Sequence, residues 1–358
     1  MSHNQSGNGR FGDHIPSNVQ TALNGLAVRS YTAADYGHLD AWMESLAQFY
    51  DGHSSDNKLL DQLVNAEGSD SKGFFTLKKA LLVSVDQHQA PTGALCLNYK
   101  RGGAVKIGPV VVDACRRGQG IGKTLFAAAD TFAIAVGARK LFATTSHLNT
   151  TVNHLFETYG YRQEAVFPNQ YKQGSNELVW GKFTGVYPRV FDGKVESVVA
   201  DEDAPVVGVS SYTEADRGYI TSVNNTYGGW HDDLGEDFID GMVAGHKREL
   251  FFQDKGKIIL LGRTAREIPV GMLTYTPKRG GPVKVYPLAG TPSAQFGLIE
   301  KAKEMAEDNG NHKLYTFAHQ ADTAQHDLLT VAGFIGRGTL QSPYKDGHDL
   351  VAFDMMVK

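Results

Sequence analysis

Residues 105–125 read VKIGPVVVDACRRGQGIGKTL, and this stretch decides the fold. The apolar, β-branched run at its start predicts a buried strand, and the apolar residues after the glycines predict a helix that ends near residue 136. Between them, a Gly-rich turn directs successive backbone N–H groups toward one concavity beside the positive end of the helix. Glycine lets phosphate oxygens approach the backbone closely, and Arg117 can add a charge-assisted contact. The stretch therefore predicts a site for a pyrophosphate.

Two better-known phosphate motifs do not fit this turn. Gly122, Lys123 and Thr124 match the end of a P-loop, but Arg117 stands where its first glycine is required. The dinucleotide fingerprint also fails, because no glycine follows Gly122 at position 123 or 125. The remaining alternative is a tight connection that binds nothing, for which three glycines in five residues are more than is needed.

The chain repeats itself over a whole domain. SYTAAD at 30–35 returns as SYTEAD at 211–216, and PTGALCLNYKRGGAVKI at 91–107 returns as PVGMLTYTPKRGGPVKV at 269–285, with nine of seventeen positions identical. HLFETYGY at 154–161 and YKQGSNELV at 171–179 also have later partners in the same order. The repeat predicts two tandem copies of one α/β domain.

Strands alternate with helices in each copy, after an opening antiparallel meander. In the first copy we expect strands over 25–31, 79–86, 92–99, 105–113 and 140–145, a helix over 150–159 and two closing strands. This pattern predicts an α/β fold with a mixed (α+β) sheet. We expect a tail at 1–25, the first domain at 26–183, a linker at 184–205 and the second domain at 206–358.

Composition excludes several other classes of protein. A net charge of −4 argues against a nucleic-acid partner, and no apolar run is long enough to span a membrane. Two cysteines, Cys96 and Cys115, make a disulfide framework or a cysteine-rich metal site improbable, and no other spacing suggests a metal. Without an apolar leader at its start, the chain is expected in the cytoplasm.

The strand, the turn RRGQGIG at 116–122 and the later NTTVNHLFETYGY at 149–161 together resemble the GCN5-related N-acetyltransferases (GNAT). The resemblance covers most of residues 27–183 and implies acetyl-CoA as the donor, with no metal. It implies that the turn holds the CoA pyrophosphate and that the strand backbone pairs with the pantetheine arm. The expected cofactor-binding residues are Val110, Val111, Val112, Arg117, Gly118, Gln119, Gly120, Ile121, Gly122, Lys123, Asn149 and Phe156.

The second copy lacks this turn. AGTPSAQFGLI replaces ACRRGQGIGKTL and is shorter, with Gly290, Ser293 and Gln295 expected roughly where Arg117, Gly120 and Gly122 stand in the first copy. A glutamine in place of glycine would block phosphate approach. We therefore expect a degenerate second copy that either walls the acceptor pocket or only stabilises the first. Arg101 and Lys106, matched by Arg279 and Lys284, are interpreted as hairpin structure because they recur in both copies.

The resemblance implies direct attack of a primary amine on the acetyl thioester, with an N–H of the strand near Val110 to Val112 stabilising the oxyanion. Many family members protonate the leaving thiolate with a Tyr at the position of Phe156, which cannot donate. Tyr159, Tyr161 and Tyr171 are the alternative acids, unless the thiolate leaves unaided. His147 is a candidate base or a solvated loop residue, and Asn149 is a cofactor contact, a helix N-cap or both.

The acceptor is expected against the loop after the first helix, whose candidate substrate-binding residues are Glu44, Tyr50, Asp51 and His53. Asp56 follows them. The sequence predicts an N-acetyltransferase, with a small-molecule primary amine as the first choice of acceptor. A protein N-terminal or lysine acetyltransferase and a non-catalytic acyl-CoA-binding scaffold are the alternatives. A homodimer is left open.

Overall fold

In this computed structural model, the structure describes residues 26–46, 76–100, 102–185, 197, 199, 205–226, 235–248, 250, 256–278, 280–343 and 347–357. No described helix is long and apolar enough to cross a membrane. Three of the candidate substrate-binding residues, Tyr50, Asp51 and His53, lie outside these ranges, as does Asp56. Glu44 lies in a helix, but its side chain is also outside them.

The elements of the first copy lie close to the predicted ones, and the boundaries differ by at most a few residues. In chain order they are β1 (Ala27–Ser30), α1 (Tyr36–Leu46), β2 (Thr76–Val85), β3 (Pro91–Lys100), β4 (Ala104–Val112), α3 (Ile121–Ala135), β5 (Lys140–Ser146), α4 (Thr150–Thr158), β6 (Arg162–Lys172) and β7 (Ser175–Phe183).

The second copy follows the same order with one further described helix near its start. Its elements are β8 (Gly208–Ser211), α5 (Arg217–Thr226), α6 (Gly235–His246), β9 (Ile258–Arg263), β10 (Pro269–Pro277), β11 (Pro282–Gly290), α7 (Pro292–Asp308), β12 (Lys313–His319), α8 (Thr323–Val331), β13 (Ile335–Leu340) and β14 (Leu350–Met356).

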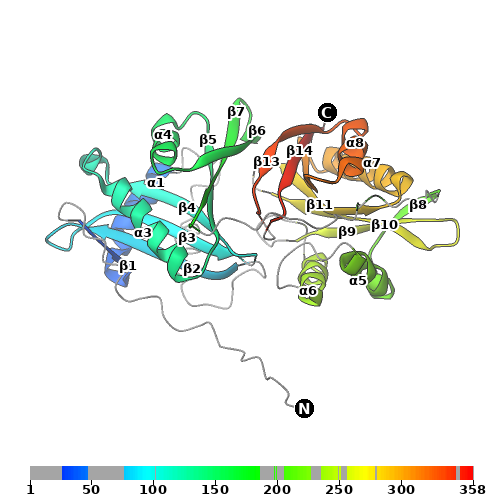
Figure 1. The fold of residues 1–358 in the computed structure, drawn as a ribbon, viewed down its shortest axis with the longest axis horizontal. Coiled ribbons are helices and arrows are strands. Elements are labelled where there is room, and N and C mark those ends of the chain that lie inside the picture. Colours follow the sequence, from blue (N-terminus) through cyan, green and yellow to red (C-terminus); the bar gives the residue numbers. More distant parts are fainter. Residues whose placement is uncertain are drawn as a thin grey trace, which may run out of the picture.

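All fourteen described strands form one mixed sheet in the order β1-β2-β3-β4-β5-β7-β6-β13-β14-β12-β11-β10-β9-β8. Neighbouring strands are antiparallel except for β4 with β5 and β11 with β12, which are parallel. The predicted α/β fold with a mixed sheet is therefore confirmed. The two copies lie side by side in Figure 1 and meet where β6 pairs with β13.

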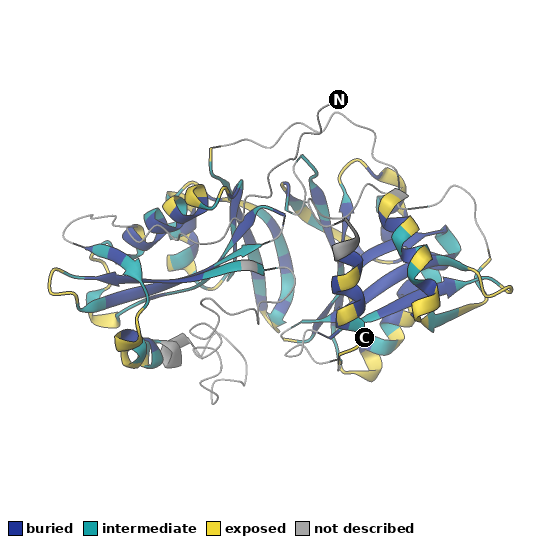
Figure 2. Ribbon diagram, turned by 90° about the horizontal axis from the view of Figure 1, so that it is seen from below, coloured by how far each residue is buried: buried dark blue, intermediate teal, exposed yellow. Residues whose placement is uncertain are grey.

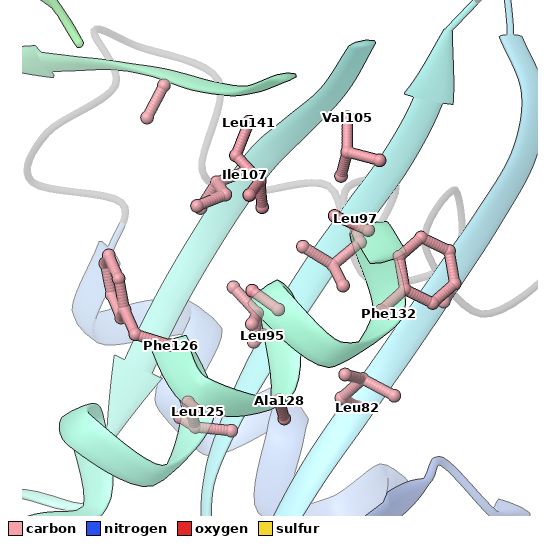
Figure 3. Packing of buried hydrophobic residues seen from close by; sticks show 14 of the residues in the cluster. Leu82, Leu95, Leu97, Val105, Ile107, Leu125, Phe126, Ala128, Phe132 and Leu141 are labelled. Carbon is pink, nitrogen blue, oxygen red and sulfur yellow. The ribbon is translucent and has the colours of Figure 1, made fainter. Parts of the chain in front are cut away.

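Helix α3 packs across the strands of the first copy. Its apolar stripe, which includes Leu125, Ala128 and Phe132, faces Leu82, Leu95, Leu97, Val105, Ile107 and Leu141 (Figure 3). These side chains are almost fully buried, and the helix shows its exposed residues only on the side away from the sheet (Figure 2). Burial of this stripe holds the N-terminal end of α3 against the end of β4.

The junction between the copies has an approximate two-fold symmetry. Equivalent residues of the two copies differ by 173 in number here, and they make equivalent contacts. Ala165 pairs with Gly338, and Lys140 Nζ donates to the carbonyl of Gln341 at 2.6 Å, as Lys313 Nζ does to Pro168 at 2.8 Å. Each lysine is buried in an ion pair, Lys140 with Glu164 and Lys313 with Asp354. The copies therefore associate through equivalent positions, as two subunits of a symmetric dimer would.

Candidate active site

Strands β4 and β5 separate after a short stretch of pairing. Their parallel register covers only residues 104–106 against 140–142. Strand β5 then stays with β7 up to the pair Ser146–Glu177, whereas β4 follows β3 to Val112. On β4 the register shifts so that Gly108 and Pro109 together oppose Cys96, which is a β-bulge. The bulge lies where the strands part, so the second half of β4 has an edge that β5 does not cover.

Backbone groups of two residues face that uncovered edge. The N–H of Asp113 donates to the carbonyl of Thr92 at 3.0 Å, which makes Gly93–Val112 a pair without direct hydrogen bonds. Because such pairs alternate with hydrogen-bonded ones in an antiparallel ladder, Val111 bonds with β3, and Val110 and Val112 direct their N–H and C=O groups toward β5. Val110 and Val112 can therefore accept a further extended chain, whereas the backbone of Val111 is already used.

The Gly-rich turn lies directly beyond this edge. Gly118 and Gly120 have φ of 80° and 84°, a left-handed conformation in which side chains are strained, and a Cβ at either would meet no atom within 4 Å. Gly120 is also the N-cap of α3, so the N–H groups of the first helical turn have no partner within the helix. Arg117 is exposed beside them. This open, glycine-lined helix terminus fits a pyrophosphate group. The uncovered backbone groups of Val110 and Val112 fit the extended pantetheine arm that is attached to the pyrophosphate.

Gly122 serves packing rather than phosphate approach. A Cβ there would lie 3.3 Å from Leu155 Cδ2, so the glycine lets α4 pack closely over the first turn of α3. Ile121 is buried in the core, and Lys123 is exposed. The predicted turn residues that precede α3, together with the N-terminal end of α3, form the open surface of the turn.

In the second copy, protein atoms fill the position that the open turn occupies in the first copy. Only Thr291 separates β11 from α7, and the buried Gln295 donates from Nε2 to the carbonyl of Gly290 at 3.0 Å. The register matches Gly290 to Val112, so the expected match of Gly290 to Arg117 is wrong; the residues equivalent to 114–118 are missing instead. Val199 bridges in parallel to Gly290, on the edge that β4 leaves uncovered in the first copy. Ser197 bonds the α8 N-cap, Asp322, at 2.6 Å.

Asn149 is the N-cap of α4, and its Oδ1 accepts from the N–H of Val152. His147 lies in the preceding turn, where its Nδ1 accepts from the N–H of Asn176 at 2.9 Å. The same nitrogen also lies 3.3 Å from the carbonyl oxygen of Asn176, so the ring is held against the start of β7. The geometry favours a positioning role for both residues over the base role considered for His147.

The aromatic candidates on and after α4 lie mainly in the core. Phe156 is 1% exposed and packs against Phe126, Tyr161 and Trp180, so it offers no surface to a cofactor in this structure. Tyr159 is half-buried against Phe126, and burial together with the charge of Asp130 raises its pKa. Tyr171 lies far along β6, where its backbone contacts the hairpin of the second copy at Gly280.

Glu177 is the functional candidate that sequence reasoning missed. It lies on β7 opposite Ser146, at the end of β5, and is 9% exposed. Burial raises its pKa to about 7, although a hydrogen bond with Thr144 and the charge of Lys106 partly oppose the shift. Lys106 is on β4 at the last pair before the strands part, so the carboxyl lies near the base of the gap.

The repeat itself holds a signal for this residue. The position equivalent to Glu177 in the second copy is Leu350, which pairs with His319 as Glu177 pairs with Ser146. A buried acid on a strand is uncommon, and at this position the copy with the Gly-rich turn has one whereas the other copy has a leucine. Among the described residues, no group of three His, Cys, Asp or Glu side chains could hold a metal ion.

Residues 39–161 match the family model described as acetyltransferase (GNAT) family. These residues are a GNAT acetyltransferase domain. The matched residues contain the parted strands, the Gly-rich turn and α4. A search of curated proteins finds no match.

Several solved structures of proteins named N-acetyltransferases are similar to part of this chain. A GCN5-related N-acetyltransferase from Kribbella flavida is 18% identical over 44% of this chain and 98% of its own, with a TM-score of 0.38. Spermidine N-acetyltransferase from Vibrio cholerae, in complex with CoA and spermine, is 13% identical over 45% and 97%, with a TM-score of 0.39. An aminoglycoside 6'-N-acetyltransferase complexed with coenzyme A is 15% identical over 45% and 98%, with a TM-score of 0.36.

Proposed function

We propose that the first copy, residues 26–183, transfers an acetyl group from acetyl-CoA to the primary amine of a small molecule, and that residues 206–358 form a degenerate copy without a cofactor site. The observation that carries the proposal is the uncovered edge at Val110 and Val112, which leads directly to the open glycine turn at the start of α3. An extended pantetheine arm and its pyrophosphate need this pair of features in this order.

Glu177 is the proposed general base. A bound ammonium group loses its proton to the Glu177 carboxylate, and the amine nitrogen forms a bond with the thioester carbonyl carbon. The N–H of Val110 or Val112 stabilises the oxyanion. As the carbon–sulfur bond breaks, the departing thiolate takes the second proton of the nitrogen, so the products are the amide and the CoA thiol. A pKa of about 7 suits the base, since the carboxyl is about half ionised at neutral pH yet basic enough to take the proton.

The cofactor site is tested by calorimetric titration of acetyl-CoA into the wild-type protein and two matched glycine variants. Gly120→Glu places a carboxylate at the open helix terminus and should abolish binding. Gly137→Glu is the control, because Gly137 follows the same helix, has a φ of 68° and is equally open. One site per chain, lost only in Gly120→Glu, supports the proposal.

Other results of these measurements would reject specific parts of the proposal. Two sites per chain would overturn the degenerate second copy. Absence of binding to the wild type would overturn the cofactor assignment. Binding without turnover of any amine on a broad panel would favour a non-catalytic acyl-CoA-binding protein instead.

A further inference from the structure

A pair of serine hydroxyls lies beside the proposed base. Ser146 ends β5 and Ser175 begins β7, and their Oγ atoms are 2.7 Å apart. The register of the two strands places Ser146 opposite Glu177. The N–H of His147 donates to the carbonyl of Asn176 at 2.8 Å, so these two residues form a hydrogen-bonded pair of the ladder. Ser146 and Glu177 are therefore a non-hydrogen-bonded pair, the kind in which the Cα atoms are only about 4.5 Å apart and the side chains lie closer.

The two serines and the carboxyl share one face of the sheet. Side chains alternate along a strand, so Ser175 and Glu177 point to the same side of β7, and Ser146 points to that side from β5. The core beneath α3 and α4 lies on the other face, where it contains Leu141 and Trp180. Helix α1 packs on the face of the serines, because its core cluster uses the alternate residues of β2 and β3. The serine pair is thus on the side where the acceptor is expected, against the loop after α1.

The serine pair has one hydroxyl proton more than its hydrogen bonds use. One proton forms the bond between the two oxygens, and either oxygen can be its donor. The N–H of Leu148 donates to Ser146 Oγ at 3.2 Å, which occupies a lone pair and no hydroxyl proton. Within the described part of the chain, no atom accepts the second hydroxyl proton. Because Ser175 is only 9% exposed, an oxygen atom that accepts this proton would be bound favourably.

Glu177 is held from its other side by Thr144. Thr144 precedes Ser146 by two residues on β5, and its hydrogen bond with the carboxyl fixes the position of Glu177. Ser175 precedes Glu177 by two residues on β7, a separation of about 6.6 Å along the strand. A molecule whose amine contacts Glu177 therefore places the atoms two or three carbons from that amine next to the serine pair.

The second copy lacks this arrangement. With the common offset of 173 residues, His319 and His348 stand where the first copy has Ser146 and Ser175, and the centroids of their rings are 4.9 Å apart. The same copy has Leu350 in place of the acid. The hydroxyl pair therefore occurs together with the acid and the Gly-rich turn, as a part of the acceptor site would.

We propose that the acceptor carries a hydroxyl or ether oxygen two or three carbons from its amine, and that Ser146 and Ser175 together donate a hydrogen bond to this oxygen. This inference rests on the proposed function and narrows its acceptor to a class, the 1,2- and 1,3-amino alcohols and their ethers. The serines recognise the acceptor and take no part in proton transfer.

The test compares pairs of amines in which a methyl group replaces a hydroxyl group, using the full chain and acetyl-CoA. The pairs are 2-aminoethanol with propylamine, 3-aminopropan-1-ol with butylamine and 6-aminohexan-1-ol with heptylamine. In at least one of the two short pairs, we expect the alcohol to exceed its partner in kcat/KM by about tenfold, the effect of one hydrogen bond. In the long pair we expect no such preference. The ether 2-methoxyethylamine should likewise exceed butylamine, because its oxygen only accepts.

The double variant Ser146→Ala/Ser175→Ala removes both hydroxyls, since either serine alone would keep a proton to donate. It should reduce the ratio of alcohol to alkylamine in kcat/KM to about one. Ser84→Ala/Thr92→Val is the matched control, because it removes another buried pair of hydroxyls, 3.0 Å apart on β2 and β3 and away from β5 and β7. The ratio should stay at its wild-type value in this control.

A ratio that falls in the serine variant and persists in the control supports the assignment. Equal kcat/KM within both short pairs would overturn it, as would a ratio that persists in the serine variant. An equal loss of kcat for alcohols and alkylamines would also overturn it, because the serines would then act on the reaction and not on recognition.

Binding separates this inference from the proposed function. Calorimetric titration of the same amines into the protein with CoA measures the preference without turnover. If no amine is acetylated, the proposed function fails, whereas tighter binding of the short alcohols that only the serine variant loses still supports the serine site. Equal binding of alcohols and alkylamines would overturn the serine site.

Discussion

Glu177 has the position, burial and basicity of a general base, and each of these can be tested at a single residue. Glu177→Gln keeps the shape of the side chain and removes the proton acceptor, so we expect kcat to fall by about 100-fold or more while acetyl-CoA affinity stays the same. In the wild type, kcat/KM should rise with pH through the pKa of about 7 and then level off, because only the ionised carboxylate accepts a proton. In the variant this rise should be absent.

Thr144→Val gives the control for that profile. The hydrogen bond with Thr144 lowers the pKa of Glu177, so its removal should move the rise in kcat/KM to higher pH without abolishing it. A profile that is unchanged in both variants would show that Glu177 is not the group that titrates.

The same carboxyl should weaken the folded state at alkaline pH. Its folded pKa of about 7 is above the ordinary value of 4.5 for a glutamate, so folding favours the protonated form. The native state then binds more protons between these values, and the free energy of unfolding falls as pH rises through that window. Glu177→Gln should therefore raise the free energy of unfolding by about 3 kcal/mol at pH 8, and by much less at pH 4, in urea titrations. Equal effects at both pH values would contradict this interpretation.

At the scale of elements, local pattern was enough to predict most of the fold. Residues close together in the chain determine three features: the β-branched run of β4, the glycines of the turn and the apolar stripe of α3. All three could therefore be predicted from the sequence. The glycines of the turn could be predicted for the same reason. Gly118 and Gly120 take the positive φ that a Gly-rich turn implies.

What the sequence did not reveal depends on residues that are distant in the chain. The parting of β4 from β5 and the contact of Glu177 with Thr144 both result from pairing between remote strands. Phe156 was expected near the cofactor, but Trp180 and Phe126, which bury it, come from β7 and α3.

The close contact between α3 and α4 gives a prediction at this scale. Gly122→Leu would force the side chain into Leu155, whose Cδ2 would lie only 3.3 Å from the first added atom, the Cβ. We expect α4 to move away from α3, with a lower free energy of unfolding and weaker acetyl-CoA binding, measured by urea titration and calorimetry. Gly118→Ala is the contrasting variant, since its Cβ meets nothing and only its positive φ is strained. An unchanged affinity in Gly122→Leu would show that α4 does not shape the cofactor site.

For the whole molecule, the continuous sheet predicts that the two copies unfold as one unit. Their junction includes the β6–β13 pairing and one buried lysine from each copy, which is ion-paired within its own copy and also donates to a carbonyl of the other. Removing one partner of a buried pair leaves an uncompensated charge and costs about 3–5 kcal/mol. Differential scanning calorimetry should show a single transition in the wild type, and Lys140→Met, which removes the cation paired with the buried Glu164, should lower the stability of both copies together.

A glycine pair on β13 tests the junction without changing charge. A Cβ at Gly338 would lie 2.3 Å from the carbonyl oxygen of Glu164, whereas at Gly336 the nearest atom, on Phe353, is 3.9 Å away. Gly338→Ala should therefore push β13 from β6 and either split the thermal transition or lower it by several degrees, about the effect of 1–3 kcal/mol. Gly336→Ala, on the same strand, should change it little. Equal effects of the two substitutions would contradict this role of the β6–β13 pairing.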